Sequence, residues 1–249
     1  MRSHTDLFLL PGLLEDAEAF HAVRLGVADI AHTRVADLTG ADSIEALARA
    51  ALEQAPERFH LAGHSMGGYV ALEMQRQAPQ RVEKLALLNT HARPDSPEAT
   101  ENRRRLMALA ERDFPTVIAT LLPKLMLPAH VADANLAGIV TTMALAVGRE
   151  AFLRQERAII GRVDSRPLLG AVSCPTLVVA ARDDQLMPVE WLEELARGIP
   201  GAELEIVEEC GHMAPIEKPR EVIKLLREWI TGTSEPGPSF PVEAAPPSS

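Results

Sequence analysis

The sequence has 249 residues, of which 47% are hydrophobic, and its 25 Lys and Arg against 35 Asp and Glu give a formal net charge of −10. This length and apolar content allow one sizeable hydrophobic core with a small accessory module. The acidic balance argues against a nucleic-acid or anionic-membrane partner, because both require concentrated positive charge. The one basic run, at residues 103–105, is typical of a solvated helix face.

Cysteine content and apolar runs bear on where the protein works. Cys174 and Cys210 are too few for a disulfide framework and suit a reducing compartment. No stretch approaches the roughly 20 apolar residues that span a bilayer, and the first residues show no secretory-signal pattern. We therefore expect a cytoplasmic monomer or homodimer without membrane partners.

Strand-like and helical patterns alternate through the first third of the chain. Apolar runs predict strands at residues 7–10, 33–38, 59–62 and 82–88. A capping-box pattern at Asp42 and Glu45 precedes apolar residues at helical spacing over residues 44–52, and a second helix is predicted at 69–77. The alternation predicts an α/β fold whose mostly parallel sheet carries helices on both faces.

The pattern changes after residue 92. Helical periodicity covers residues 97–112, 115–127, 132–147 and 149–160 with no convincing strand, which predicts a helical cap or lid over residues 93–170. Strands at 176–180 and 202–207, each followed by a helix (189–197 and 221–230), return the chain to the core. We expect the core to comprise residues 1–92 and 171–231, and the Pro- and Ser-rich residues 232–249 to form a disordered tail.

Ser65 is the candidate nucleophile. It lies in a G-x-S-x-G motif at residues 63–67, between a predicted strand and a predicted helix. A serine at such a sharp turn is exposed above the carboxyl edge of the sheet, and the flanking glycines prevent a clash between strand and helix. A plain Gly/Ser turn is the alternative interpretation.

A serine hydroxyl needs a base within hydrogen-bond reach. His212 is the best candidate among the eight histidines, because it lies in the loop after the last predicted strand. His64 adjoins Ser65, but its side chain should point the other way and serve packing or a supporting hydrogen bond. His91 either lines the pocket mouth or has a structural role.

The acid that orients the imidazole is expected after the strand at 176–180, where Asp183 and Asp184 both lie. We choose Asp184, and assign Asp183 to the turn or to solvent. The oxyanion needs two N–H donors. We expect one from Met66, the residue after the nucleophile, and one from Leu13 in the loop after the first strand, where Gly12 allows a close approach of the backbone.

These segments together resemble the α/β-hydrolase superfamily over roughly residues 6–230. The resemblance rests on G-H-S-M-G-G at Ser65, A-R-D-D-Q-L-M-P around Asp184 and C-G-H at His212. It implies the α/β-hydrolase fold, a helical cap that roofs the active site, and carboxylesterase-like chemistry. Two features depart from the family pattern: Pro11-Gly12 stands where many members have His-Gly, and no residues remain for the usual leading β-hairpin.

We expect a serine hydrolase that cleaves a small or medium, largely apolar carboxylic ester through an acyl-enzyme, without a metal or organic cofactor. Ser65 excludes members that use an aspartate nucleophile, and the longer Gly-rich oxyanion loop usual in carbon–carbon hydrolases is absent. Enol-lactonase, thioesterase and perhydrolase activities remain alternatives of the same fold. A small-molecule receptor with residual turnover, and a transferase or lyase, are the alternatives from other classes.

The substrate pocket is expected to be apolar and adaptable. Methionines beside the catalytic loops and in the cap favour such a lining. Arg162, Asp164 and Arg166 either place a charged substrate group or form salt bridges at the cap boundary, of which we favour the salt bridges. The residues predicted to line the pocket are Leu14, His91, Met126, Met143, Met187 and Met213.

Overall fold

A computed structural model describes residues 5–233, so all but the first two residues of the tail predicted for 232–249 lie outside the described residues. Six strands form one sheet in the order β2-β1-β3-β4-β5-β6, and every neighbouring pair is parallel. The strands are β1 (Thr5–Leu10), β2 (Ala31–Val35), β3 (Phe59–His64), β4 (Val82–Leu88), β5 (Thr176–Ala181) and β6 (Glu203–Val207). The predicted α/β fold with a parallel sheet is confirmed.

Alternate residues of the strands face opposite sides of the sheet, so each central strand contributes to two separate cores. In β1, Phe8 and Leu10 join one hydrophobic cluster, while Leu7 and Leu9 join the other. Strands buried on both faces read as continuous apolar runs, which is why β1, β4 and β5 are recognisable from the sequence.

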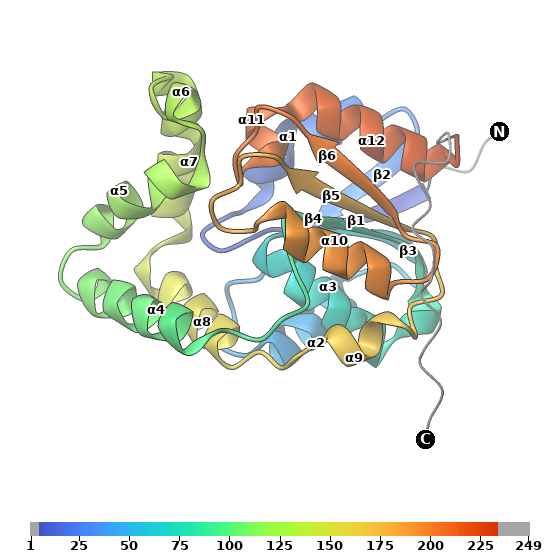
Figure 1. Ribbon diagram of the computed structural model, residues 1–249, viewed down its shortest axis with the longest axis horizontal. Coiled ribbons are helices and arrows are strands. Elements are labelled where there is room, and N and C mark those ends of the chain that lie inside the picture. Colours follow the sequence, from blue (N-terminus) through green and yellow to red (C-terminus); the bar gives the residue numbers. More distant parts are fainter. Residues whose placement is uncertain (1–4, 234–249) are drawn as a thin grey trace.

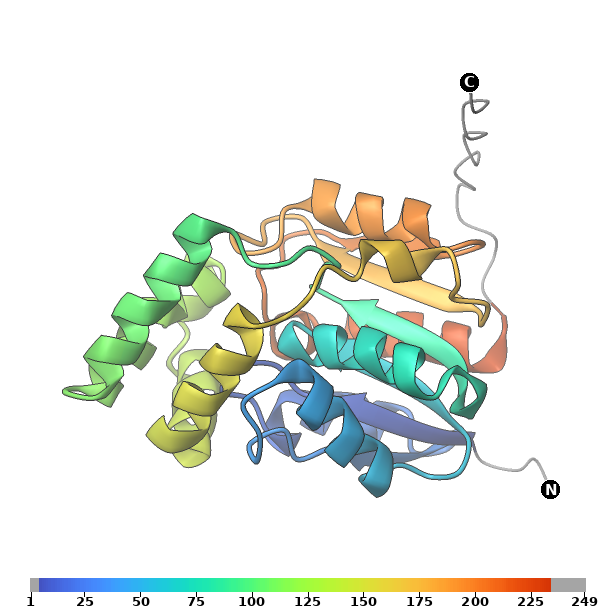
Figure 2. The ribbon, with the colours of Figure 1, turned by 90° about the horizontal axis from the view of Figure 1, so that it is seen from below.

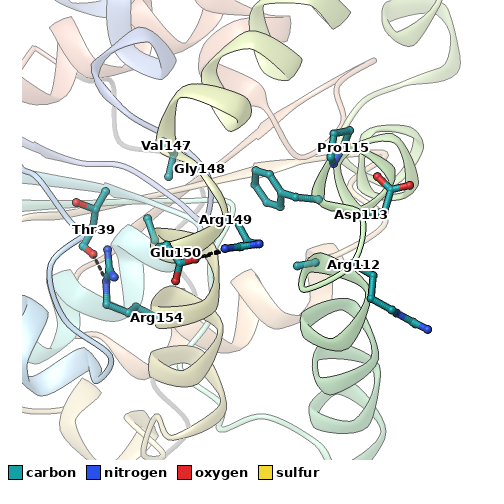
Figure 3. A pocket seen from close by; sticks show the side chains of 12 residues that line it. Thr39, Arg112, Asp113, Pro115, Val147, Gly148, Arg149, Glu150 and Arg154 are labelled. Atoms are coloured by element: carbon teal, nitrogen blue, oxygen red, sulfur yellow. Dashed lines mark hydrogen bonds and ion pairs between the residues drawn. The ribbon is translucent and has the colours of Figure 1, made fainter.

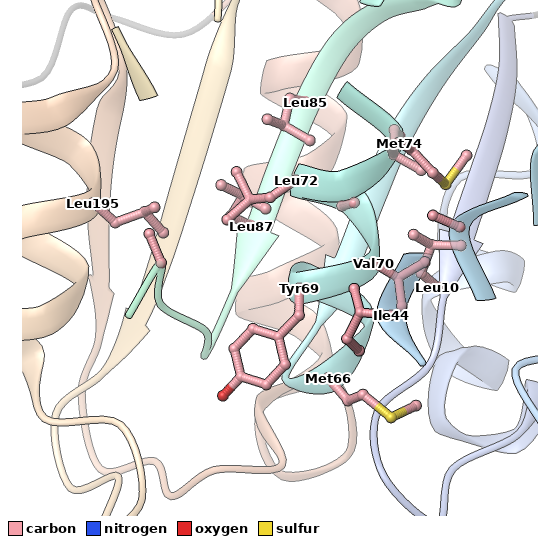
Figure 4. Close-up of a cluster of buried hydrophobic side chains, with 14 of the residues drawn as sticks. Leu10, Ile44, Met66, Tyr69, Val70, Leu72, Met74, Leu85, Leu87 and Leu195 are labelled. Carbon is pink, nitrogen blue, oxygen red and sulfur yellow. The ribbon is translucent and has the colours of Figure 1, made fainter. Parts of the chain in front are cut away.

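Helices cover both faces of the sheet (Figure 1). The first cluster includes residues of α2 (Ile44–Gln54), α3 (Met66–Gln77) and α10 (Val189–Gly198). Figure 4 shows Tyr69, Val70 and Leu72 of α3 among the strand residues Leu10, Leu85 and Leu87. The opposite face is covered by α1 (His21–Gly26) and α12 (Pro219–Thr231). Short helices fill the connections: η1 (Ala17–Phe20), η2 (Pro79–Arg81) and α11 (Ala214–Glu217).

Between β4 and β5 the chain forms only helices. They are α4 (Pro97–Ala110), α5 (Phe114–Leu125), α6 (Pro128–Val131), α7 (Ala134–Val147), α8 (Arg149–Ile160) and α9 (Arg166–Leu169). Figures 1 and 2 show α4, α5, α7 and α8 gathered to one side of the sheet, outside the layers formed by the other helices. We call α4–α9 the helical insertion.

Two local predictions are wrong in detail. The side chain that caps α2 is Ser43, whose hydroxyl accepts from Ala46 N–H at 3.2 Å, rather than Asp42. The second strand covers Ala31–Val35 instead of residues 33–38, because its pairing with β1 begins at Thr5. Neither difference moves a residue of the candidate site.

Within residues 5–233, no single helix has both the length and the apolar character needed to cross a membrane. The helix pair α7 and α8 passes that test jointly, with a bend of 89° between its members.

Candidate active site

The carboxyl ends of parallel strands meet at one edge of the sheet, and ligands of open α/β sheets bind there. Ser65 follows β3, Asp184 lies in the loop after β5, and His212 lies in the loop after β6. Residues 11–15 follow β1, which is paired directly with β3. Side chains from four separate segments therefore gather at a single edge.

Ser65 occupies a strained turn between β3 and α3. Its φ of 52° and ψ of −117° lie where residues other than glycine rarely occur. The backbone is held by Ser65 N–H, which donates to Leu88 O at 3.0 Å, and by the Thr90 hydroxyl, which donates to Ser65 O at 2.8 Å. A Cβ on Gly67 would lie 2.1 Å from Leu10 O, so only glycine allows α3 to approach β1 this closely.

Three side chains predicted from the sequence form one chain of hydrogen bonds. His212 Nε2 lies 2.8 Å from Ser65 Oγ, and His212 Nδ1 lies 2.7 Å from Asp184 Oδ2. All three residues are buried, with exposed fractions of 8%, 2% and 7% for Ser65, His212 and Asp184. This arrangement can remove a proton from the serine hydroxyl and stabilise the imidazolium that results.

The Asp184 carboxylate is held by more than the histidine. Its Oδ1 accepts from Leu186 N–H at 2.8 Å and from Met187 N–H at 3.0 Å, and its Oδ2 accepts from Asn89 Nδ2 at 2.9 Å. Burial acts to raise the pKa of Asp184, but His212 and these donors outweigh it and hold the pKa below its usual value. Sequence reasoning missed Asn89, although a polar residue directly after the apolar strand β4 is a weak signal for it.

The two other histidines near the site have different surroundings. His64 points away from Ser65 Oγ, as predicted: its Nδ1 lies 2.8 Å from Glu15 Oε1, and its Nε2 lies 2.8 Å from His212 O. His91 contacts Tyr69 Oη at 3.1 Å. Burial, reinforced by nearby arginines, lowers the pKa of His91 to about 3, so this ring is neutral and a weak base.

The loop after β1 presents three successive N–H groups, two of which bind side chains. Gly12 N–H donates to Glu15 Oε2 at 2.7 Å, and Leu14 N–H donates to Gln155 Oε1 at 3.0 Å. Leu14 has a positive φ of 61°, which turns the chain sharply at this point. In the described part of the chain, Leu13 N–H has no such partner. Met66 begins α3, so its N–H is among those that a helix leaves unpaired.

A cavity of about 340 Å³ opens onto Ser65 and His212. Five of the predicted lining residues, Leu14, His91, Met143, Met187 and Met213, lie on its wall. The prediction for Met126 is wrong: this residue is buried in the second hydrophobic cluster, where its Cα lies 3.0 Å from the position of a Cβ on Gly211. Apolar side chains of the insertion complete the wall: Leu106, Ile118, Leu121, Leu122, Leu125 and Val140.

Charged side chains form one part of the same wall. Arg103 lies 2.8 Å from Glu156 and 3.1 Å from Asp95, and Arg162 lies 2.6 Å from Asp95. Glu156 is fully buried, and its Oε1 has no hydrogen-bond partner among the described residues. Arg162 therefore forms a salt bridge where the insertion begins and ends, which agrees with the salt-bridged cap boundary favoured from the sequence.

Glu217 connects the insertion to the loop that carries His212. Its Oε2 accepts from Leu127 N–H at 2.9 Å and lies 2.6 Å from His130 Nδ1, and its Oε1 accepts from Met213 N–H at 3.0 Å. The backbone adds a further bond, from His212 N–H to Leu125 O at 2.9 Å. The loop that carries His212 is thus fixed to the insertion by hydrogen bonds.

A second cavity, of about 610 Å³, lies at the start of α5 and the junction of α7 and α8 (Figure 3). Its wall includes Arg112, Asp113 and Glu150, and Arg154 donates to Thr39 O at 2.7 Å. Neither Ser65 nor His212 lines it, so it is separate from the site.

Comparisons with known proteins agree with this geometry. A model of the alpha/beta hydrolase family matches residues 4–225. The chain belongs to this family. Within the alpha/beta hydrolase family it is 29% identical to a putative carbamate hydrolase RutD of Variovorax paradoxus, over 74% of this chain and 70% of that protein.

Two further alpha/beta hydrolases show how varied the family is. The chain is 30% identical to a 2-hydroxy-6-oxononadienedioate/2-hydroxy-6-oxononatrienedioate hydrolase of Paraburkholderia xenovorans, over 70% of this chain and 62% of that protein. A thermophilic esterase from Thermogutta terrifontis has a similar structure, with a TM-score of 0.83, 31% identity, and coverage of 92% of this chain and 90% of the esterase. These relatives are named for hydrolysis of different classes of substrate.

Proposed function

We propose that this alpha/beta hydrolase cleaves carboxylic esters through an acyl-enzyme formed on Ser65. The observation that carries the proposal is the chain of hydrogen bonds that runs from Asp184 through His212 to Ser65 Oγ. Ser65 and His212 line a cavity of about 340 Å³. The likeness to the Thermogutta terrifontis esterase supports ester chemistry over the other reactions named among its relatives.

In the first half-reaction, Ser65 Oγ attacks the ester carbonyl carbon while His212 Nε2 accepts the hydroxyl proton. The negative oxygen of the tetrahedral intermediate is stabilised by Met66 N–H and Leu13 N–H. His212 then gives its proton to the departing alcohol. In the second half-reaction, water attacks the acyl carbon and gives a proton to His212. As the bond between the acyl carbon and Ser65 Oγ breaks, His212 returns this proton to Ser65 Oγ, so the acid leaves and the free serine hydroxyl is restored. Asp184 keeps the imidazole in the tautomer that leaves Nε2 free to accept.

The cavity wall favours a small or medium substrate with a mainly apolar acyl or alkyl group. The insertion contributes leucine, isoleucine and valine side chains, and Met143, Met187 and Met213 add flexible ones. Such a wall binds chains of different length without strict selection, so we expect a broad optimum over several acyl lengths.

The test is hydrolysis of p-nitrophenyl esters from acetate to octanoate. We expect turnover by the wild type and none above background by Ser65→Ala. Ser96→Ala is the matched control, because it removes a hydroxyl from the same cavity without touching His212, and it should retain activity. Equal inactivity of wild type and Ser65→Ala on every ester would refute the proposal.

The charged part of the wall favours a second candidate, an ester or lactone that carries a polar substituent. Arg103 lines the cavity, and Glu156 Oε1 lies beside it without a partner among the described residues. A comparison of a monocarboxylic methyl ester with a dicarboxylic half-ester of equal length, and with a lactone, separates the candidates. A higher kcat/KM for the polar substrates would favour the second one.

A further inference from the structure

A buried carboxylate and a buried imidazole lie beneath the nucleophile, outside the Ser65–His212–Asp184 chain. Glu15 and His64 have side chains that are 3% and 0% exposed, and they approach each other to 2.8 Å. Removing both groups from water is costly unless they are paired and fully hydrogen-bonded. Their retention at this place therefore calls for an explanation beyond packing.

The contacts of the His64 ring determine how many protons it carries. Nδ1 faces the carboxylate of Glu15, and Nε2 faces the backbone carbonyl of His212 at 2.8 Å. Both partners are acceptors, so both ring nitrogens must donate, and only the imidazolium has two N–H groups. Burial acts to lower the pKa of His64, but the charge and hydrogen bond of Glu15 outweigh it and raise the pKa. With two acceptors facing its two nitrogens, the geometry favours an imidazolium ring paired with the Glu15 carboxylate.

This pair joins two loops that carry parts of the reaction site. Glu15 Oε2 accepts from Gly12 N–H at 2.7 Å, which fixes the start of the loop that presents Leu13 N–H. His64 Nε2–H donates to the carbonyl of His212 itself. The two loops follow β1 and β6, which β3, β4 and β5 separate in the sheet, so the sheet alone does not set their spacing.

Gly12 shows how close this contact is. A Cβ at Gly12 would lie 2.7 Å from Glu15 Oε1 and 2.9 Å from Glu15 Cδ. A side chain there would displace the carboxylate from its place between the Gly12 N–H and the His64 ring. The sequence Gly12-Leu13-Leu14-Glu15 is therefore matched to a carboxylate folded back onto its own loop.

We propose that the Glu15–His64 ion pair is a positioning device, which holds the oxyanion loop and the backbone of His212 at a fixed distance across the sheet edge. It acts through Gly12 and His212 and touches no reacting atom. The expected effect on kcat rests on the hydrolase function proposed above. The expected effect on the position of His212 does not depend on any substrate.

The first measurement is ¹⁵N and ¹H NMR of the histidine rings in the intact protein. The His64 signals are assigned by their loss in His64→Gln. The ionisable groups that face the His64 ring are Glu15, His212 and Asp184. We expect both ring nitrogens of His64 to carry a proton at pH 8. In Glu15→Gln, which keeps an acceptor for Gly12 N–H and offers NH₂ to Nδ1, the ring should become neutral. A singly protonated His64 ring in the wild type at pH 8 would overturn the ion pair.

The second measurement is of position. His212 Nδ1–H, which donates to Asp184 at 2.7 Å, should give a low-field proton resonance in the wild type. We expect it to shift or broaden in Glu15→Ala and His64→Ala, and kcat for p-nitrophenyl butyrate to fall roughly 10- to 100-fold with KM within about twofold, because small misplacements of reacting groups are costly. Glu15→Gln, which preserves the contacts, should retain most of the activity.

His60→Gln is the matched control, since His60 is a buried histidine of the same strand β3 that does not line the cavity. It should leave the resonance and kcat unchanged. Thermal unfolding confirms that each variant compared is folded. An unchanged resonance and unchanged kcat in folded His64→Ala would overturn the proposal. A wild type that shows the ion pair and the resonance but hydrolyses no ester would instead refute the proposed function alone.

Discussion

The carboxyl edge of the sheet and the outer helices of the insertion, α4, α5 and α7, contribute to one cavity but differ in how many of their residues are buried. Every residue of β3 and β5 is buried, whereas Ala110 is the one buried residue among the 14 of α4. A Cβ on Gly67 at the sheet edge would collide with backbone, whereas one on Gly138 in α7 would meet nothing within 4 Å. Groups that must be placed accurately therefore lie on the rigid side, and the variable, apolar wall lies on the other.

The largest effect is expected at Asp184. In Asp184→Asn the carboxamide no longer stabilises the imidazolium and allows the wrong tautomer of His212, so kcat should fall about 10³- to 10⁴-fold. Asp183→Asn is the matched control: Asp183 is exposed in the same loop and should stay within about twofold of the wild type. Steady-state kinetics on one p-nitrophenyl ester distinguishes them. Equal losses in both variants would contradict the assignment of Asp184.

A Gly→Ala substitution should change the free energy of unfolding in opposite directions in the two regions. Gly67→Ala places a Cβ 2.1 Å from Leu10 O and should lower the free energy of unfolding by about 3 kcal/mol or more. Gly138→Ala lies within α7 with open space around it, and should raise that free energy by roughly 0.5 to 1 kcal/mol through helix propensity. Urea unfolding measures both. A stabilised Gly67→Ala would show that the edge is less rigid than described.

Glu217→Gln should weaken the connection between the two regions. The amide NH₂ cannot accept a hydrogen bond, so at least one of the groups on Leu127, His130 and Met213 loses its acceptor. We expect a loss of about 2 kcal/mol in the free energy of unfolding and a raised KM. Glu221→Gln, at an exposed position of α12, should change neither quantity. An unaltered KM in Glu217→Gln would mean that this connection does not shape the cavity.

Acid sensitivity should arise partly from His60 on the sheet side. Burial, with the Lys84 charge, lowers the pKa of His60 to about 4 from its ordinary 6.5. The unfolded state then binds the proton more tightly, so the stability that His60 contributes is present above about pH 6.5 and is lost as the pH falls toward 4. When the pH is lowered from 7 to 4.5, the free energy of unfolding of His60→Gln should fall by roughly 1 to 2 kcal/mol less than that of the wild type. Equal falls in the free energy of urea unfolding for the wild type and His60→Gln would contradict this prediction.

The smallest effect on catalysis is expected from the cavity wall of the insertion. Met143→Ala shortens a side chain of the cavity wall and enlarges the cavity. The ratio of kcat/KM for the octanoate ester to kcat/KM for the butyrate ester should therefore rise about 10-fold. Met107→Ala is the control, because Met107 packs in the cluster of α4, α5 and α8 and does not line the cavity. If both variants shift the preference equally, the cavity wall is not what selects the acyl chain.

Patterns within short stretches of the sequence predict much of this structure. The apolar strands, the glycine-rich turn at Ser65 and the loops of Asp184 and His212 each follow from local patterns, and the structure brings these residues together. Met126 lies in the second hydrophobic cluster and not on the cavity wall, because an apolar residue of a helical insertion fits either environment.

The supporting contacts could not be predicted in the same way. Asn89 and Asp184 are 95 residues apart, Glu15 and His64 are 49 apart, and Leu127 and Glu217 are 90 apart. A single polar residue in a loop gives no indication of its distant partner until the order of the strands is known. Pairing of this kind depends on topology and not on local propensity.

The most direct test of the account is covalent labelling with diethyl p-nitrophenyl phosphate, followed by intact-protein and peptide mass spectrometry. We expect one diethylphosphoryl group per chain, on Ser65, with no adduct in Ser65→Ala and a labelling rate at least about 10²-fold lower in His212→Ala. Failure to label, or labelling of another residue at a rate that does not depend on His212, would contradict it.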